Sequence, residues 1–145
     1  MSALSSSAVF RQFILAAFLA LATCLTVCAA DAPNWTGEYA DKKFLNGQAV
    51  FQMSLEQSGN TVTVWFSAGY SDGREPAPEA EGTGKVNAKD SVEFKFEDND
   101  GNSGTGTITR AGNDIVVSLR AAKVRDRKVL VFYREGIRLA RQTKK

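Results

Sequence analysis

The sequence predicts an all-β fold: a single antiparallel up-and-down β-barrel of about eight strands, preceded by a signal-peptide helix. Three observations support this. Apolar and polar residues alternate with a period of two through most of residues 31–145. Short turn sequences rich in Gly, Asn and Asp separate the alternating runs. Many short strands joined by tight turns are typical of a barrel or a sandwich, and closure of a barrel removes exposed sheet edges.

The first thirty residues have the layout of a secretory signal peptide. Arg11 precedes an apolar run from Phe13 to Val27, and small residues follow before Asp31. The run is shorter than the ~20 residues that a membrane-spanning helix needs. We therefore expect residues 1–30 to be removed after Ala30, and residues 31–145 to form one domain that is periplasmic or secreted.

Both cysteines, Cys24 and Cys28, lie in this leader. "LATC" and "LTVC" are imperfect versions of the motif at which bacterial lipoproteins are cut and lipidated. Lipidation is the alternative form of processing, and we expect the protein to be anchored in a membrane only if it occurs. After cleavage at Ala30 no thiol remains, so the stability of the domain depends on its core rather than on disulfides.

The strands follow from the alternation. "VFQMSLE" sends Phe51, Met53 and Leu55 to one face, and "SVEFKFE" does the same with Phe94 and Phe96. The predicted strands are Trp35–Ala40, Ala49–Gln57, Thr61–Ala68, Gly82–Asn87, Ser91–Glu97, Gly104–Thr109, Ile115–Ala121 and Val129–Glu135, with Ile137–Arg141 as a candidate ninth.

Turn chemistry separates these runs. "SGN" at 58–60, "NAKD" at 87–90 and "AGND" at 111–114 indicate tight turns, because Gly and Asn accept a positive φ at low cost. Residues 67–82 contain two prolines and three glycines, and we expect a long mobile loop there, at one end of the barrel.

The two ends of the domain carry a resemblance. "NWTGEY" at 34–39 and "YREGIRLAR" at 133–141 are similar to the first and last strands of small exported bacterial lipocalin-like (calycin-like) β-barrel proteins. In such barrels a tryptophan plugs the closed end and a late arginine packs across its ring. The resemblance implies that Trp35 closes the barrel with Arg138 or Arg141, through cation–π attraction. It concerns the architecture and carries little information about function.

The composition argues against common catalytic sites. The chain has no histidine and, after cleavage, no cysteine, which excludes Ser–His and Cys–His pairs and ordinary zinc sites in the mature domain. A pair of carboxylates could still hydrolyse a substrate, but the geometry of a pair cannot be deduced from sequence. We expect a non-catalytic protein without a cofactor.

The stretch "EDNDGNSGTGT" at 97–107 resembles the start of a calcium loop, with Asp98, Asp100 and Asn102 at alternate positions. Ser103 stands where the pattern requires glycine, and Thr109 where it requires glutamate. We interpret the stretch as a hairpin turn and keep its three oxygen-bearing residues as weak metal candidates. Gly104 and Gly106 indicate a bend or a close approach within a strand.

The charges are unevenly distributed. Residues 72–100 hold nine acidic and four basic residues, and residues 120–145 hold ten basic and two acidic residues. Either the basic segment faces an anionic partner, or neighbouring acidic strands neutralise it. The candidate partner-binding residues are Lys123, Arg125, Arg127, Lys128 and Tyr70.

Three functions agree with these observations. The first is a binding or inhibitor-type module that engages an envelope protein, an anionic envelope polymer or lipid. The second is a carrier of a small apolar ligand inside the barrel, and the third is a structural component of the envelope. An eight-stranded barrel can be filled or can hold one small ligand; the bulky inward Phe51, Phe66 and Phe96 favour a filled core. We do not expect a nucleic-acid partner for an exported protein.

Overall fold

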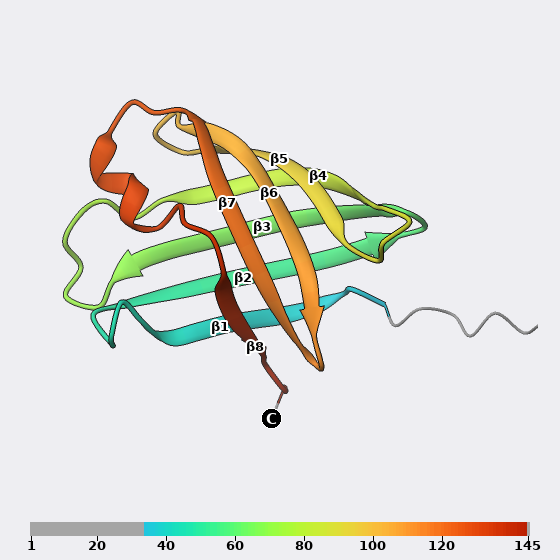
Figure 1. Ribbon diagram of the computed structural model, residues 1–145. Coiled ribbons are helices and arrows are strands. Elements are labelled where there is room, and N and C mark those ends of the chain that lie inside the picture. The colour runs from blue at the N-terminus through green and yellow to red at the C-terminus, as the bar shows by residue number, and fades with distance from the viewer. Residues whose placement is uncertain (1–33, 145) are drawn as a thin grey trace, which may run out of the picture. The chain divides into compact units, whose positions relative to one another are not determined.

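In the computed structural model, which describes residues 34–144, eight antiparallel strands close into a barrel (Figure 1). Each strand pairs with the next along the chain, and β8 returns to β1. The strands are β1 (Gly37–Phe44), β2 (Ala49–Ser58), β3 (Thr61–Tyr70), β4 (Glu79–Val86), β5 (Val92–Asp98), β6 (Ser103–Ala111), β7 (Asp114–Lys123) and β8 (Ile137–Arg141). The all-β class and the up-and-down barrel of eight strands are confirmed. The predicted signal peptide, its expected cleavage site and both cysteines lie outside the described residues.

One predicted strand is wrong. Residues 129–135 do not form a strand; the segment contains the 3-10 helix η1 (Arg127–Val131) and a turn, and the candidate ninth strand is β8. Val129 and Phe132, three residues apart, are both fully buried, as the three-residue period of a 3-10 helix allows. The amide of Phe132 donates to the Val129 carbonyl at 2.9 Å. Val129, Val131 and Tyr133 do alternate in sequence, but tertiary packing overrides that pattern.

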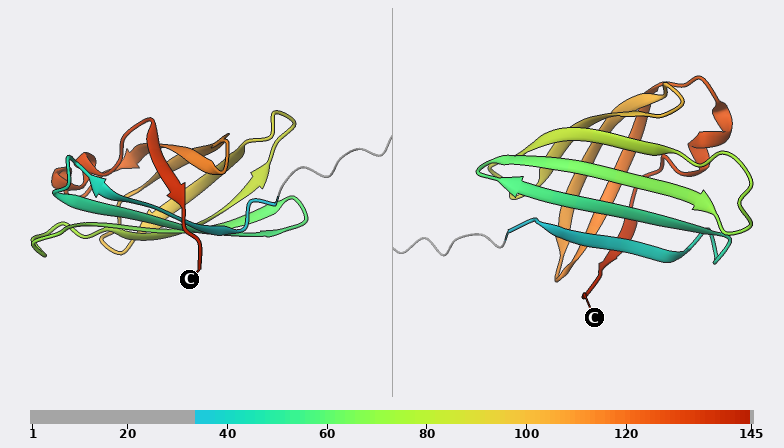
Figure 2. Two further views of the ribbon diagram at one scale, coloured as in Figure 1. Left: turned by 90° about the horizontal axis from the view of Figure 1, so that it is seen from below. Right: turned by 180° about the vertical axis from the view of Figure 1, so that it is seen from behind.

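The up-and-down order places the connections alternately at the two ends of the barrel. One end, which we call the loop end, carries the β1–β2 turn, the β3–β4 loop, the β5–β6 turn and the β7–β8 connection with η1. These connections lie on the left of Figure 1, and both views of Figure 2 show them together at one end. The opposite end carries the three remaining turns and the start of β1.

The interior is filled with aromatic side chains. The ring of Phe66 stacks on Phe51 with centroids 5.6 Å apart, and Phe96 lies edge-on to it at 5.2 Å. Tyr133, from the turn after η1, packs against Phe96 at 5.1 Å. The predicted inward residues of β2, β3 and β5 are all buried. Side chains from the connections thus complete a core that the strands begin.

Glycines let two neighbouring strands approach the Phe94 ring. Gly84 of β4 and Gly106 of β6 lie opposite Phe94 in the sheet register. A Cβ atom on Gly106 would lie 2.2 Å from Phe94 Cζ, and one on Gly84 would lie 2.4 Å from the Glu93 carbonyl oxygen. Gly106 of β6 therefore serves a close approach, which is one of the two roles that the sequence indicates.

Candidate functional site

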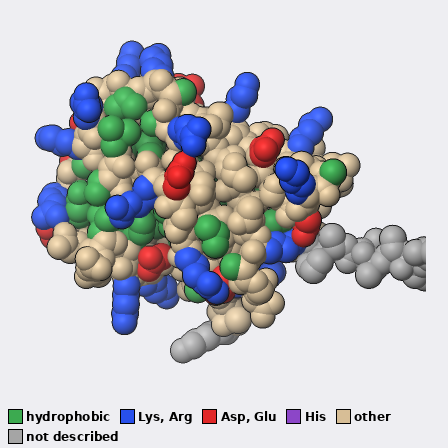
Figure 3. Space-filling view, in the orientation of Figure 1, with side chains coloured by type: hydrophobic (Ala, Val, Ile, Leu, Met, Phe, Trp, Pro, Cys, Tyr) green, Lys and Arg blue, Asp and Glu red, His purple; other side chains and the backbone are tan. Residues whose placement is uncertain are grey.

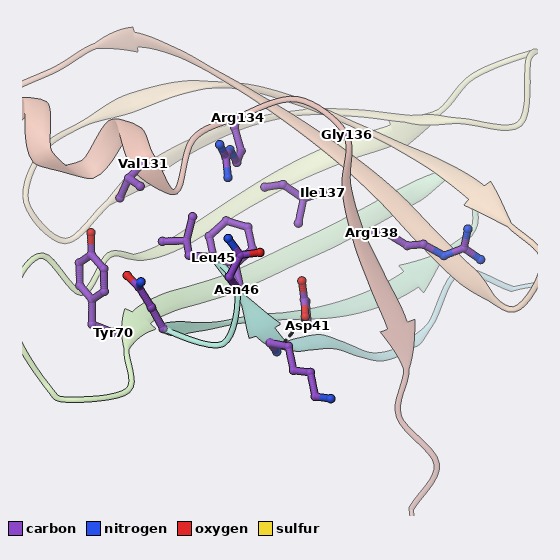
Figure 4. A pocket seen from close by; sticks show the side chains of 12 residues that line it. Asp41, Leu45, Asn46, Tyr70, Val131, Arg134, Gly136, Ile137 and Arg138 are labelled. Atoms are coloured by element: carbon purple, nitrogen blue, oxygen red, sulfur yellow. Dashed lines mark hydrogen bonds between the residues drawn. The ribbon is translucent and has the colours of Figure 1, made fainter.

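A cleft opens at the loop end where β1 and β8 separate. Their ladder contains two residue pairs, Tyr39 with Arg141 and Ala40 with Ala140, and the pairing of β1 with β2 shifts register between Asp41 and Phe44. Beyond this point the strands enclose an open cleft of about 560 Å³, which we call the seam cleft (Figure 4). Its lining includes Asp41, Lys43, Asn46, Tyr70, Arg134 and Ile137. The weakest junction of the barrel is thus also a concave surface.

Arg134 gives the seam cleft its main charge. Its side chain reaches from the chain after η1 toward the β1–β2 turn, where Leu45 and Asn46 lie (Figure 4). The guanidinium carbon lies 5.9 Å from the centre of the Phe44 ring, and the Arg134 carbonyl accepts the amide hydrogen of Leu119 at 2.9 Å. No ion pair between described residues involves Arg134 or Lys43. The lining also includes Arg138, which pairs with Asp114. Lys43 and Arg134 thus face one acidic lining residue, Asp41, and the cleft suits an anionic group.

The predicted basic residues form an exposed part of the β7–β8 connection. We call Lys123–Lys128 the basic connection; its Lys123, Arg125, Arg127 and Lys128 are all exposed. Within the part of the chain that the structure describes, none of these four cations has a carboxylate within ion-pair distance. Figure 3 shows Lys and Arg side chains around a patch of hydrophobic ones at the left of the view, over the loop end. Cations without carboxylate partners stay available to an external anion.

Two of the three metal candidates, Asp98 and Asn102, form a buried hydrogen-bond network, to which the exposed Asp100 contributes its backbone amide. The Oδ1 atom of Asp98 accepts the amide hydrogens of Asp100 (2.9 Å) and Asn102 (2.8 Å), and its Oδ2 atom accepts from Asn102 Nδ2 and the Tyr133 hydroxyl. Asp98 and Asn102 are buried, so these bonds satisfy a carboxylate that water does not reach. Both carboxylate oxygens are thus occupied by donors of the protein, as in a structural turn.

The same network holds the basic connection in place. Asn102 Oδ1 accepts the amide hydrogens of Arg125 at 2.6 Å and Asp126 at 3.2 Å. Burial, together with the hydrogen bond to Asp98, raises the pKa of Tyr133 above its ordinary value, so its hydroxyl stays a neutral donor. The β5–β6 turn therefore fixes the backbone of the predicted partner-binding loop at Arg125 and Asp126.

Trp35 is buried at the end opposite the loop end, and its stacking partner differs from the prediction. The guanidinium carbon of Arg110, at the end of β6, lies 3.7 Å from the centre of the Trp35 ring, and Arg110 also pairs with Asp90 at 2.8 Å. Arg141 instead lies over the Tyr39 ring at 5.7 Å, and Arg138 pairs with Asp114 at 3.3 Å. The predicted partners were Arg138 and Arg141 because the resemblance was drawn from the last strand, in which both of them lie.

The sequence contained a signal for Arg110. Gly106, Ile108 and Arg110 are alternate residues of β6, so their side chains lie on the same face of the strand. Because Ile108 points into the barrel, Arg110 also projects from the inner face, near the end of the strand. An inward cation there requires an acidic or aromatic partner, and the structure provides both.

Tyr70 lies at the end of β3, in the lining of the seam cleft. Its ring packs edge-on against Phe132 at 5.3 Å, and the guanidinium carbon of Arg74 lies 4.0 Å from the ring centre on the β3–β4 loop side. The structure thus brings Tyr70 together with Lys43 and Arg134, which the sequence analysis did not select. Arg134 belongs to the basic C-terminal segment, but its sequence neighbours do not show that it faces the β1–β2 turn.

The chain was compared with protein-family models, curated proteins and solved structures, and no match was found. Among residues 34–144, no helix is long and apolar enough to cross a membrane.

Proposed function

We propose that the protein is an exported, non-catalytic binding module that engages an anionic partner with its loop end. The observation that carries this proposal is that the cations of the basic connection, Lys123, Arg125, Arg127 and Lys128, are exposed and have no carboxylate partner among the described residues. The two hydrogen bonds to Asn102 hold their backbone in place, which reduces the entropy lost when a partner binds.

The seam cleft supports the same proposal and adds selectivity. Arg134 and Lys43 can attract one anionic group of the partner into a concave site, while Asn46 and Tyr70 offer hydrogen bonds and an aromatic face. A carboxylate or a phosphate fits this lining. The partner is thus an acidic protein surface or an anionic polymer or lipid of the envelope.

The packing of the interior favours a surface site over an internal ligand. The rings of Phe66, Phe96 and Tyr133 pack against one another inside the barrel, and Phe51 stacks on Phe66. A carrier needs the space that these side chains fill. The proposal therefore places recognition on the connections, with the barrel as their rigid support.

Charge reversal tests the proposal. The variant Arg125→Glu/Arg127→Glu/Lys128→Glu should bind poly-L-glutamate, a soluble polyanion, at least about tenfold more weakly in isothermal titration calorimetry at low salt. The matched control is Lys85→Glu/Lys89→Glu/Lys95→Glu, which reverses three exposed cations on β4, the β4–β5 turn and β5. An equal loss in both variants would mean that net charge, and not the basic connection, determines binding.

The seam cleft is tested with a smaller change. Arg134→Ala removes one cation from the cleft and should weaken binding of poly-L-glutamate by a factor of about three to ten, because one phosphate- or carboxylate-directed contact is lost. Arg120→Ala is the control, since Arg120 is an exposed cation of β7 that is already paired with Glu135 at 2.8 Å. Identical affinities for the two variants would remove the seam cleft from the proposed site.

A further inference from the structure

The basic connection and η1 expose large apolar side chains beside their cations. Val124 is 36% exposed and Leu130 is 37% exposed, and they enclose Arg125, Arg127 and Lys128 in the sequence. Among the described residues, the third large hydrophobic side chain exposed to this degree is Trp65, on the wall of β3. Exposed valine and leucine side chains that flank, in the sequence, cations without carboxylate partners among the described residues suit a surface with both charged and apolar parts.

The local structure presents these residues in a fixed arrangement. The Asp126 side chain accepts the amide hydrogen of Lys128 at 2.9 Å and caps η1. Val129 is fully buried and anchors the helix to the barrel, whereas Leu130 points outward. Figure 1 shows η1 at the loop end, beyond the end of β7. The apolar and cationic side chains are therefore carried by the connection and not by the wall of the barrel.

We propose that the basic connection and η1 dock on the surface of an anionic lipid bilayer. The cations of the connection contact headgroup phosphates, and Val124 and Leu130 enter the boundary between headgroups and acyl chains. The inference rests on the proposed function, because it names the anionic partner of the same loop end. A bilayer is favoured because its interface can contact both the cations and the two apolar side chains, whereas a soluble polyanion contacts only the cations.

The acidic residues near the basic connection determine how strongly docking should depend on salt. Asp126 belongs to the connection and Asp100 lies exposed on the neighbouring β5–β6 turn, so the cations exceed the acids there only modestly. We therefore expect docking that weakens strongly as salt rises from low to physiological concentration. Docking of this kind is peripheral and does not require lipidation of the leader.

Vesicle binding by the full chain tests the inference. The probes are vesicles of phosphatidylcholine with about 30% phosphatidylglycerol, and vesicles of phosphatidylcholine alone. Arg125→Glu/Arg127→Glu/Lys128→Glu should reduce partitioning onto the anionic vesicles by at least about 100-fold, since each of the three cations near such a surface contributes about fivefold. The control Lys85→Glu/Lys89→Glu/Lys95→Glu should partition like the wild type.

Two further variants report on the apolar contact. Val124→Ser/Leu130→Ser keeps every charge and should partition at least about tenfold less onto anionic vesicles, with unchanged affinity for poly-L-glutamate. Leu130→Trp, in a Trp65→Phe background, places a fluorophore on η1; its emission should shift to shorter wavelength with the anionic vesicles and not with phosphatidylcholine alone. This local readout is independent of any membrane affinity of the leader.

The outcomes separate the two proposals. Poly-L-glutamate binding without an emission shift on anionic vesicles would overturn lipid docking and leave the proposed function standing, with an acidic protein or a soluble polymer as partner. Absence of both poly-L-glutamate binding and the emission shift on anionic vesicles would overturn both the proposed function and lipid docking. Undiminished partitioning of Val124→Ser/Leu130→Ser would also refute the inference, because the apolar side chains are what distinguish a bilayer from other polyanions.

Discussion

Asn102 connects the core of the barrel to the basic connection, and its replacement by alanine should affect stability and binding together. Asn102→Ala removes three hydrogen bonds: one donated to the Asp98 carboxylate at 2.8 Å, and two accepted from the amides of Arg125 and Asp126. A neutral bond contributes about 1 kcal/mol net and a bond to a charged group about 1.5–3 kcal/mol, so we expect a loss of about 3–5 kcal/mol. That is a large share of the ~5–15 kcal/mol typical of a domain.

The assay has a global and a local readout. Urea unfolding measures the loss of stability, and amide hydrogen exchange at Arg125 and Asp126 measures the release of the connection. Asn99→Ala is the matched control: Asn99 lies exposed on the same turn, and its Oδ1 atom accepts the Glu79 amide hydrogen at 3.0 Å, so its loss should cost less than about 1 kcal/mol. Exchange at the two amides no faster in Asn102→Ala than in the wild type would refute the reasoning. If the connection is released, poly-L-glutamate binding should also weaken, although every cation remains.

Three other predictions concern the barrel itself. Gly106→Ala should cost about 1–3 kcal/mol in urea unfolding, because the new Cβ would lie 2.2 Å from a buried phenylalanine ring, whereas Gly69→Ala, whose nearest neighbour would be 3.8 Å away, should not destabilise. The pKa of Tyr133 is raised in the folded state, so its contribution to stability is complete below about pH 10 and is lost above it by about 1.4 kcal/mol per pH unit; Tyr133→Phe should show a shallower alkaline loss. Arg110→Ala should cost about 1–3 kcal/mol and shift the emission of the buried tryptophan that it covers, while Arg138→Ala, which breaks an exposed ion pair, should cost less than about 1 kcal/mol.

Much of the fold could be predicted from the sequence because a strand with one buried face has alternating apolar and polar residues. Seven of the eight predicted runs form strands and the candidate ninth run forms β8; in runs such as "VFQMSLE" and "DIVVSLR" the inward residues are the buried ones. The prediction was wrong at 129–135, where Val129, Val131 and Tyr133 also alternate. There the bond of Tyr133 to Asp98 and the packing of Phe132 decide the conformation, and neither contact is visible in a short window of sequence.

The site could be predicted only in part, for a related reason. The charge of the basic connection is a local property, so the clustering of Lys123, Arg125, Arg127 and Lys128 can be seen in the sequence, and the structure adds that all four are exposed. The seam cleft depends on where β1 and β8 separate, which brings together residues from opposite ends of the chain. The stacking of Arg110 on Trp35 could not be predicted for the same reason: the two residues are far apart in the sequence, and neither segment specifies the other.

The order of the strands explains why the charge asymmetry of the sequence persists on the folded surface. The acidic segment supplies β4 and β5, and the basic segment supplies the end of β7 and β8; β7 pairs with β6 and β8, so one strand separates it from the acidic wall. Neutralisation does occur where geometry permits, as between Arg110 and Asp90. The basic connection leaves the barrel after β7 and is tied by Asn102 to the β5–β6 turn through backbone amides, which leaves its side-chain charges free of that contact. An up-and-down barrel with this order therefore keeps the basic connection positioned and its cations without carboxylate partners among the described residues, and those are the two conditions that binding of an anionic surface requires.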